Sequence, residues 1–154
     1  MGSDAEGEGR GTSVRNADRR WALARHLLAE NTGDLDAIME TFSPDAVFQL
    51  NDRPFAGHTL IRAQHAHFGF GGQGAFSRLR VEERRRYVTS DAIVLELTLH
   101  GKHSGPWEDL APTQRTFSLP VCTVYRFDAG GKLVSEVLYF DNAVLRQQLT
   151  GAGR

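Results

Sequence analysis

The chain is poor in cysteine and lysine, and it has no long hydrophobic run. Cys122 is the only cysteine among 154 residues, which excludes an internal disulfide and any multi-cysteine zinc or iron–sulfur site. No apolar stretch approaches the ~20 residues that a membrane-spanning helix needs. Residues 1–15 lack the apolar segment of a signal peptide. We therefore expect a cytoplasmic protein in a reducing compartment, with no membrane partner.

The charge of the chain is balanced. Eighteen Lys and Arg stand against 19 Asp and Glu, which gives a formal net charge of −1. Nucleic-acid-binding domains normally carry a strong basic excess, so no nucleic-acid partner is expected. The length predicts a single domain, which we place at residues 17–150. Residues 1–16 are rich in glycine and poor in large apolar side chains, which predicts a disordered N-terminal tail.

The hydrophobic pattern changes from a helical period to an alternating one near residue 77. Helical spacing and capping residues predict three helices, a short strand over 46–50, and a fourth helix over 141–149. Alternation predicts four long strands, at residues 77–88, 92–103, 115–128 and 133–140. Helices followed by strands indicate an α+β domain, with helices on one face of a curved, mostly antiparallel sheet. Such a sheet can enclose an apolar pocket for a small molecule.

Two runs of residues resemble a known family. The first is Gly101-Lys102-His103-Ser104-Gly105 with Pro112-Thr113-Gln114-Arg115, and the second is Tyr139-Phe140-Asp141 with Gln148-Leu149. Over about residues 20–150 the chain resembles the SnoaL-like polyketide cyclases, or ester cyclases, of the NTF2-like superfamily. The resemblance implies a cone with three N-terminal helices and a short C-terminal helix. It also implies a homodimer and a hydrophobic, polyketide-like substrate. The implied reaction is a cofactor-independent intramolecular aldol ring closure.

Asp141 and His103 are the predicted catalytic residues. In the family that the chain resembles, the acidic residue at the position of Asp141 is the general acid/base. Loss of hydration in an apolar cone would raise the pKa of this carboxyl group and suit it to proton transfer. The alternative is that Asp141 caps the helix that follows. His103 shares strand parity with Leu95, Leu97 and Leu99, so it could polarise a substrate carbonyl or pair with Asp141. It could equally be a loop-end histidine.

Five further residues are predicted to contact substrate, namely Tyr139, Trp107, Tyr125, Trp21 and Asn51. Tyr139 could orient the carboxylate or be a core tyrosine. Trp107 could cover the mouth of the cone or be a surface aromatic. Trp21 and Tyr125 are expected in the lining or the core.

No metal and no cofactor are expected. His65 and His67 lie two positions apart on a predicted helix, so they face different ways. His100 and His103 have opposite strand parity. The charged run over 78–86 is interpreted as a solvated face or a dimer contact, with binding of an anionic group as the alternative.

Other functions on the same fold remain open. A ketosteroid-type isomerase is disfavoured because Leu50 stands where its base is expected, and Asp52 comes two positions later. An epoxide hydrolase would need a carboxylate–amide–arginine cluster, for which Asn51 and Arg62 are available. A non-catalytic ligand-binding or dimerisation module is the third alternative.

Overall fold

A computed structural model of the chain describes residues 6–152, with side chains from residue 15 onward. The helices are α1 (Glu6–Thr32), α2 (Leu35–Glu40), α3 (His58–Phe68) and α4 (Asn142–Thr150). The strands are β1 (Phe42–Leu50), β2 (Arg53–Ala56), β3 (Phe76–Val88), β4 (Ala92–His103), β5 (Thr116–Phe127) and β6 (Leu133–Phe140). Among residues 6–152, no helix combines the length and the apolar character needed to cross a bilayer.

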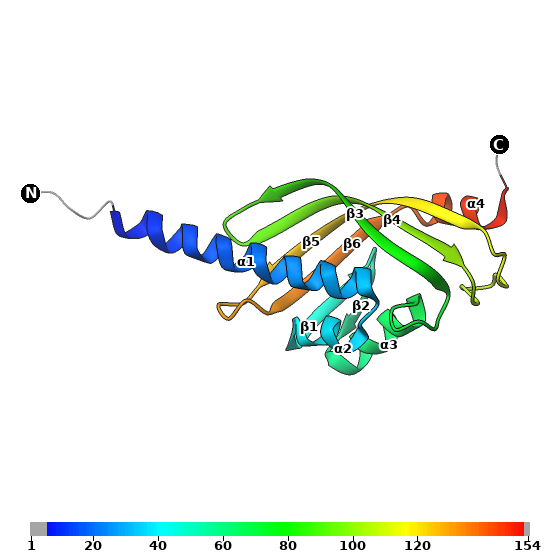
Figure 1. Ribbon diagram of the computed structural model, residues 1–154, viewed down its shortest axis with the longest axis horizontal. Helices are drawn as coiled ribbons and strands as arrows, with labels where there is room; N and C mark the ends of the chain where they lie inside the picture. Colours follow the sequence, from blue (N-terminus) through cyan, green and yellow to red (C-terminus); the bar gives the residue numbers. More distant parts are fainter. Residues whose placement is uncertain (1–5, 153–154) are drawn as a thin grey trace, which may run out of the picture.

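The six strands form one curved sheet in the order β2-β1-β6-β5-β4-β3 (Figure 1). All neighbouring strands are antiparallel except β1 and β6, which are parallel. Helices α1, α2 and α3 lie on one side of the sheet, and α4 follows β6 at its end. The predicted α+β class and the mostly antiparallel sheet are confirmed. No strand was predicted over residues 53–56, but they form β2, which pairs with β1, and Phe55 packs near Phe48 at 6.2 Å between ring centroids.

Helix α1 begins earlier than predicted, and the residues that it buries are not the ones expected. The expected disordered tail covers residues 1–16; residues 1–5 lie outside the described part, and the chain is helical from Glu6. Trp21, expected in the lining or the core, is 64% exposed. The residues that α1 buries lie on one side of the helix, and most of them are polar: Arg19, Leu23, His26, Ala29 and Glu30. Apolar periodicity does not reveal such a face, because three of its five members are ionisable.

Strand β1 begins four residues before the predicted strand. The helix before it, α2, ends at Glu40. The amide of Leu133 donates to the carbonyl of Thr41 at 2.8 Å, so pairing with β6 draws this segment into the sheet. Phe42 is buried in the core as the first residue of β1.

The loop that follows β4 is held against the segment before β3. The amides of Ser104 and Gly105 both donate to the carbonyl of Ala75, at 3.0 and 2.9 Å. A Cβ atom on Gly105 would lie 2.1 Å from the backbone oxygen of Gly74. This close approach of two backbones requires glycine at position 105.

We expect Gly105→Ala to destabilise the fold by about 1–3 kcal/mol, because the added methyl group meets fixed backbone atoms. Gly130→Ala in the turn between β5 and β6 is the matched control, since its Cβ would only touch Asp128 at 3.4 Å. The control should stay within about 0.5 kcal/mol of the parent chain. Urea unfolding of the three proteins measures both values. Equal stability of the two variants would contradict the packing described here.

Candidate active site

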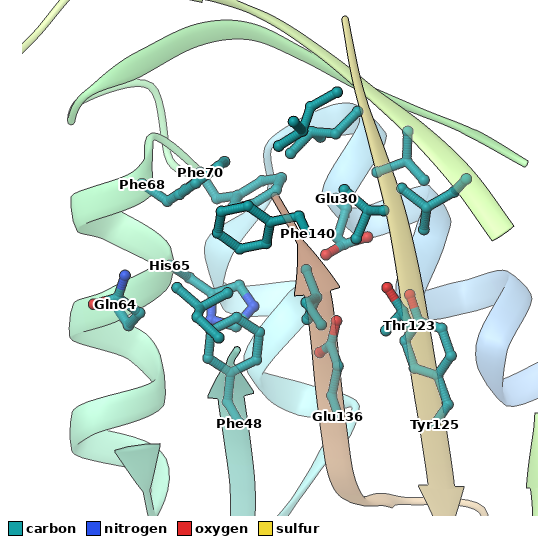
Figure 2. Close-up of a pocket in the computed structure, with 17 residues that line it drawn as sticks. Glu30, Phe48, Gln64, His65, Phe68, Phe70, Thr123, Tyr125, Glu136 and Phe140 are labelled. Carbon is teal, nitrogen blue, oxygen red and sulfur yellow. The ribbon is translucent and has the colours of Figure 1, made fainter. Parts of the chain in front are cut away.

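An apolar pocket lies between the sheet and the helices (Figure 2). The space between its lining atoms amounts to about 590 Å³, a figure that includes solvent at its open mouth. Phenylalanine, leucine and valine side chains from β1, α3, β3, β4, β5 and β6 form most of its wall. The polar residues of the wall are Glu30, Gln64, His65, Thr123, Tyr125 and Glu136. A largely apolar cavity with a few polar groups is typical of a small-molecule site.

His65 presents an unprotonated nitrogen in this pocket. It lies in the last turn of α3 and is only 2% exposed. Its Nδ1 lies 2.8 Å from the carbonyl oxygen of Ile61, and a carbonyl can only accept, so Nδ1 carries the hydrogen. Nε2 then holds a lone pair, and no hydrogen bond reaches this buried atom. Burial lowers the pKa of His65, which keeps the ring neutral.

Three ionisable residues form a buried cluster beside the pocket, and we call it the His26 cluster. His26 and Glu30 are one turn apart on α1, and Glu136 comes from β6. The Nε2 atom of His26 lies 3.5 Å from Glu30 Oε1 and 3.4 Å from Glu136 Oε2. Burial lowers the pKa of His26, but the carboxylates of Glu136 and Glu30 outweigh burial and raise it to about 10.

Two hydroxyl groups on β5 complete the polar part of the wall. Thr123 is fully buried, and no partner lies within 3.5 Å of its Oγ1 atom in hydrogen-bond geometry, although its side chain interacts with the hydroxyl of Tyr125 two residues along β5. Burial, followed by the charges of Glu136 and Glu30, raises the pKa of Tyr125 well above its ordinary value. Tyr125 therefore keeps its proton and can donate a hydrogen bond. Figure 2 shows the polar ends of Glu30, Glu136, Thr123 and Tyr125 turned toward a common region of the pocket.

Asp141 does not line this pocket, so the predicted position of its carboxylate is wrong. The side chain is exposed at the end of β6. Its Oδ1 atom accepts hydrogen bonds from the amides of Ala143 at 2.8 Å and Val144 at 3.2 Å. Asp141 is thus the N-cap of α4, which was the alternative interpretation of this residue. The carboxylate of Asp141 therefore lies at the surface and not in the apolar cone where it was expected.

His103 is buried as its strand parity predicted, but it lies away from the pocket wall. Its Nδ1 atom lies 3.0 Å from the hydroxyl of Thr113 and accepts from the amide of Thr113 at 3.3 Å. Its ring packs near Phe76, with 5.8 Å between ring centroids. Burial lowers the pKa of His103. The structure joins His103 to the loop over 112–115 and not to Asp141.

The predicted substrate contacts are divided between the pocket and other places. Tyr125 lines the pocket, whereas Tyr139 points outward and is 52% exposed. Trp107 and Asn51 line a second, more open hollow. That hollow shares Leu50, Gln64 and Phe140 with the pocket, so it lies at the pocket mouth. Trp107 is buried there against Phe76 at 5.0 Å.

The candidate groups for the alternative functions are dispersed. His65 faces the pocket, while His67 is exposed and its ring stacks on Trp107. Arg62 pairs with Asp36 at the surface at 2.5 Å. Asn51 lies elsewhere, where its Oδ1 accepts from the amide of Phe140 at 3.0 Å. The amide–arginine pair of an epoxide hydrolase is therefore not assembled from these residues.

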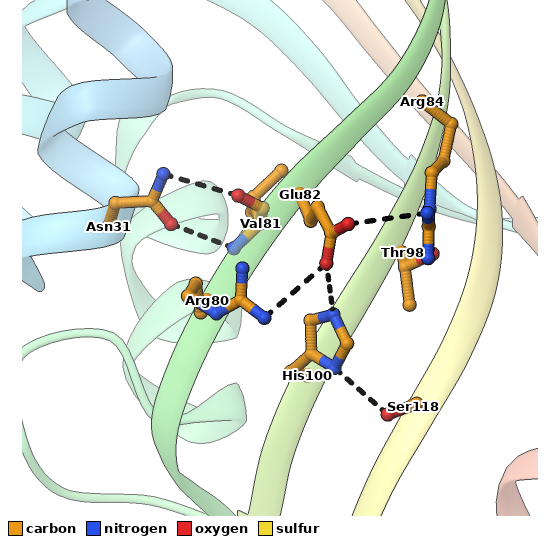
Figure 3. A network of polar contacts seen from close by, with 8 residues as sticks. All are labelled: Asn31, Arg80, Val81, Glu82, Arg84, Thr98, His100 and Ser118. Carbon is orange, nitrogen blue, oxygen red and sulfur yellow. Dashed lines mark hydrogen bonds and ion pairs between the residues drawn. The ribbon is translucent and has the colours of Figure 1, made fainter.

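The outer face of the sheet carries the charged run (Figure 3). The two ring nitrogens of His100 lie 2.8 Å from Glu82 Oε2 and 2.9 Å from Ser118 Oγ. This order resembles a nucleophilic triad, but Glu82 also pairs with Arg80 and Arg84. The amide of Ser118 is occupied by the side chain of Gln148 at 2.8 Å, so it cannot stabilise an oxyanion. We interpret this face as a network of solvated ion pairs.

Sequence reasoning missed the His26 cluster because it assigned β6 to the wrong face. The expectation that Asp141 enters the cone places the odd-numbered residues of β6 inside, whereas Glu136, Leu138 and Phe140 line the pocket. A shift of one residue moves every side chain of a strand to the opposite face. Glu136 pairs with Tyr125, which was expected in the lining or the core, and this pairing identifies the inner face of β6.

The fold is shared with solved structures of low sequence identity. A proposed SnoaL-like polyketide cyclase from Jannaschia sp. CCS1 is 18% identical with a TM-score of 0.77, covering 99% of this chain and 100% of its own. AclR, a proposed hydroxylase from Streptomyces galilaeus, is 22% identical with a TM-score of 0.74, covering 90% and 85%. A Catenulispora acidiphila protein of ketosteroid isomerase-like fold, in complex with trimethylamine, is 16% identical with a TM-score of 0.70, covering 84% and 92%.

These likenesses confirm the predicted NTF2-like fold. The family model described as SnoaL-like domain matches residues 23–136, which is most of the chain. The chain belongs to the SnoaL-like domain family, as its motifs indicated. No curated protein matches the sequence.

The position of Asp141 leads to a test of its role in capping. Asp141→Ala removes the acceptor for two amides at the start of α4 and should cost about 1 kcal/mol of stability. Asp141→Asn keeps a side-chain oxygen that caps equally well, so its stability should match that of the parent chain. Urea unfolding measures both. An equal loss in the two variants would show that the charge of Asp141, and not the cap, is what matters.

Proposed function

We propose that the protein is an enzyme that moves a proton on a hydrophobic, carbonyl-bearing small molecule held in the apolar pocket. His65 is the general base in this proposal, in place of Asp141. The supporting observation is the buried Nε2 atom of His65, which has a lone pair and no hydrogen-bond partner. A neutral base in an apolar cavity is poised for proton abstraction without first losing bound water.

The reaction would follow the ring closure of SnoaL-like polyketide cyclases. His65 Nε2 takes a proton from the carbon next to a carbonyl group, and an enolate forms. The enolate oxygen accepts a hydrogen bond from the hydroxyl of Tyr125 or Thr123. The enolate carbon then attacks a second carbonyl of the same molecule. The resulting alkoxide takes the proton back from His65, so the base is restored and no redox partner is needed.

The wall of the pocket supports this choice of substrate. Side chains such as Phe48, Phe68 and Phe140 offer apolar surface to a flat, hydrophobic skeleton. Trp107 and Asn51 at the mouth would contact the part of the substrate that extends outward. From the family resemblance we also propose a cytoplasmic homodimer.

The role of His65 can be tested without knowing the natural substrate. 2-Tetralone is a hydrophobic ketone with exchangeable protons next to its carbonyl group. The protein should accelerate their exchange with D₂O, and His65→Gln should reduce the acceleration by about 100-fold or more, because the base is lost. Proton NMR measures the exchange rate. His100→Gln on the outer face is the matched control and should retain the parent rate.

Two results would contradict the proposal, provided that unfolding curves show the variants to be folded. One is exchange that persists in His65→Gln. The other is binding of 2-tetralone by the parent protein with no acceleration, which would favour a ligand-binding module over an enzyme.

The pH dependence of the exchange gives a separate test. Burial lowers the pKa of His65, so the neutral base persists below the ordinary histidine value. The rate should be flat at neutral pH and fall on acidification with an apparent pKa below about 6.5. NMR exchange rates across the range from about pH 5 to about pH 8 cover this limb. An acid limb centred above about 6.5 would exclude His65 as the base.

A further inference from the structure

We propose that His26, Glu30 and Glu136 form a binding site for a divalent transition-metal ion such as Zn²⁺, with its open coordination position toward the apolar pocket. The proposal concerns residues other than His65 and stands independently of the proton transfer proposed above. It rests on the separations of the ligand atoms, the orientation of the imidazole, the balance of charge and a buried hydroxyl in the same pocket wall.

The separations of the ligand atoms suit a metal ion better than a proton. His26 Nε2 lies 3.5 Å from Glu30 Oε1 and 3.4 Å from Glu136 Oε2, and the three groups offer ligand atoms within 4.8 Å of one another. A hydrogen bond between an imidazolium and a carboxylate is shorter, at about 2.7–2.9 Å. Atoms bound at about 2.1 Å to one tetrahedral ion lie about 3.4 Å apart.

The imidazole of His26 is oriented as a metal ligand should be. The hydroxyl of Thr41 donates to the carbonyl of Ile38 at 2.6 Å, so its oxygen accepts from His26 Nδ1–H at 2.8 Å. Nδ1 therefore carries a hydrogen, and Nε2 is directed at the two carboxylates. Metal-binding histidines commonly donate their second ring N–H to a fixed acceptor in this manner.

The charge of the cluster is balanced by a divalent ion. Two carboxylates bring two negative charges into a site where all three residues are buried. A proton on His26 compensates only one of them, and an uncompensated buried charge is costly. A divalent ion with a neutral His26 compensates both.

A neighbouring hydroxyl indicates where a further ligand would sit. Thr123 is fully buried on β5 and lines the pocket with Glu30 and Glu136, and apart from its interaction with Tyr125 its Oγ1 atom has no partner in hydrogen-bond geometry (Figure 2). A water molecule or a substrate oxygen on the pocket side of the ion could receive a hydrogen bond from it. In that position the ion would polarise a bound carbonyl group.

The test uses the full-length protein loaded with Zn²⁺ and then freed of loose metal by buffer exchange. Elemental analysis should find one zinc ion per chain. Isothermal titration should show that Glu136→Gln weakens zinc affinity at least about tenfold. Glu96→Gln, on the outer face of the sheet, is the matched control and should bind as the parent chain does. Chains that retain no zinc, or equal affinity in Glu136→Gln and the parent chain, would overturn the proposal.

A spectroscopic readout covers the case in which Glu136→Gln does not fold. Co²⁺ in a tetrahedral site of nitrogen and oxygen ligands absorbs visible light far more strongly than hydrated Co²⁺. The parent chain and His65→Gln should both show this absorption, and Glu30→Gln should lose it. Absorption that persists in folded Glu30→Gln would place the metal elsewhere and refute the site. Because His65→Gln keeps the metal, failure of the proposed catalysis can be told apart from failure of the metal site.

Discussion

The structure depends on the burial of the His26 cluster between α1 and the curved sheet. Helix α1 places His26 and Glu30 against Glu136 of β6, and the His26 ring packs edge-on to Phe42 at 5.4 Å. Removing His26 would leave two buried carboxylates without a positive partner, and breaking a buried ion pair typically costs about 3–5 kcal/mol. Together with the hydrogen bonds between Asn31 and the backbone of Val81, the cluster fixes where α1 crosses the sheet. A positive partner, whether a proton on His26 or a bound cation, is part of that arrangement.

The apolar pocket is lined mainly by the sheet and α3, and α1 contributes Glu30. The strands curve over the helices (Figure 1). Large side chains from α3 and the sheet line the space between them. Water is largely excluded by this wall, so each polar group within it must be satisfied locally or left without a partner. His65 satisfies one nitrogen through the carbonyl of Ile61 and leaves the other free. The same burial that stabilises the core thus creates the base proposed for the reaction.

Much of the fold was predictable because local signals agreed with the final structure. Strands β4 and β6 have the predicted bounds, since alternation and the flanking turns fix both ends. The face of β6 was not predictable from alternation, because both of its faces carry apolar residues. The buried face of α1 was hidden because His26 and Glu30 are buried by pairing with Glu136 and not by their own hydrophobicity. The sequence around an acidic residue at a strand end does not distinguish a helix cap from a pocket residue. Asp141 caps α4.

The two histidines beside the pocket show how one environment yields two kinds of group. Both are fully buried, and burial alone lowers the pKa of each. His26 has two carboxylates within 3.5 Å, and they reverse the effect. His65 has a backbone carbonyl in hydrogen-bond contact, which fixes its tautomer without supplying a full negative charge. The site around His26 therefore holds a positive charge, either a proton on the ring or a bound cation. His65 stays neutral. The two side chains are chemically identical, so their different roles follow from their neighbours alone. His26 anchors the buried charges, and His65 is left as a free base.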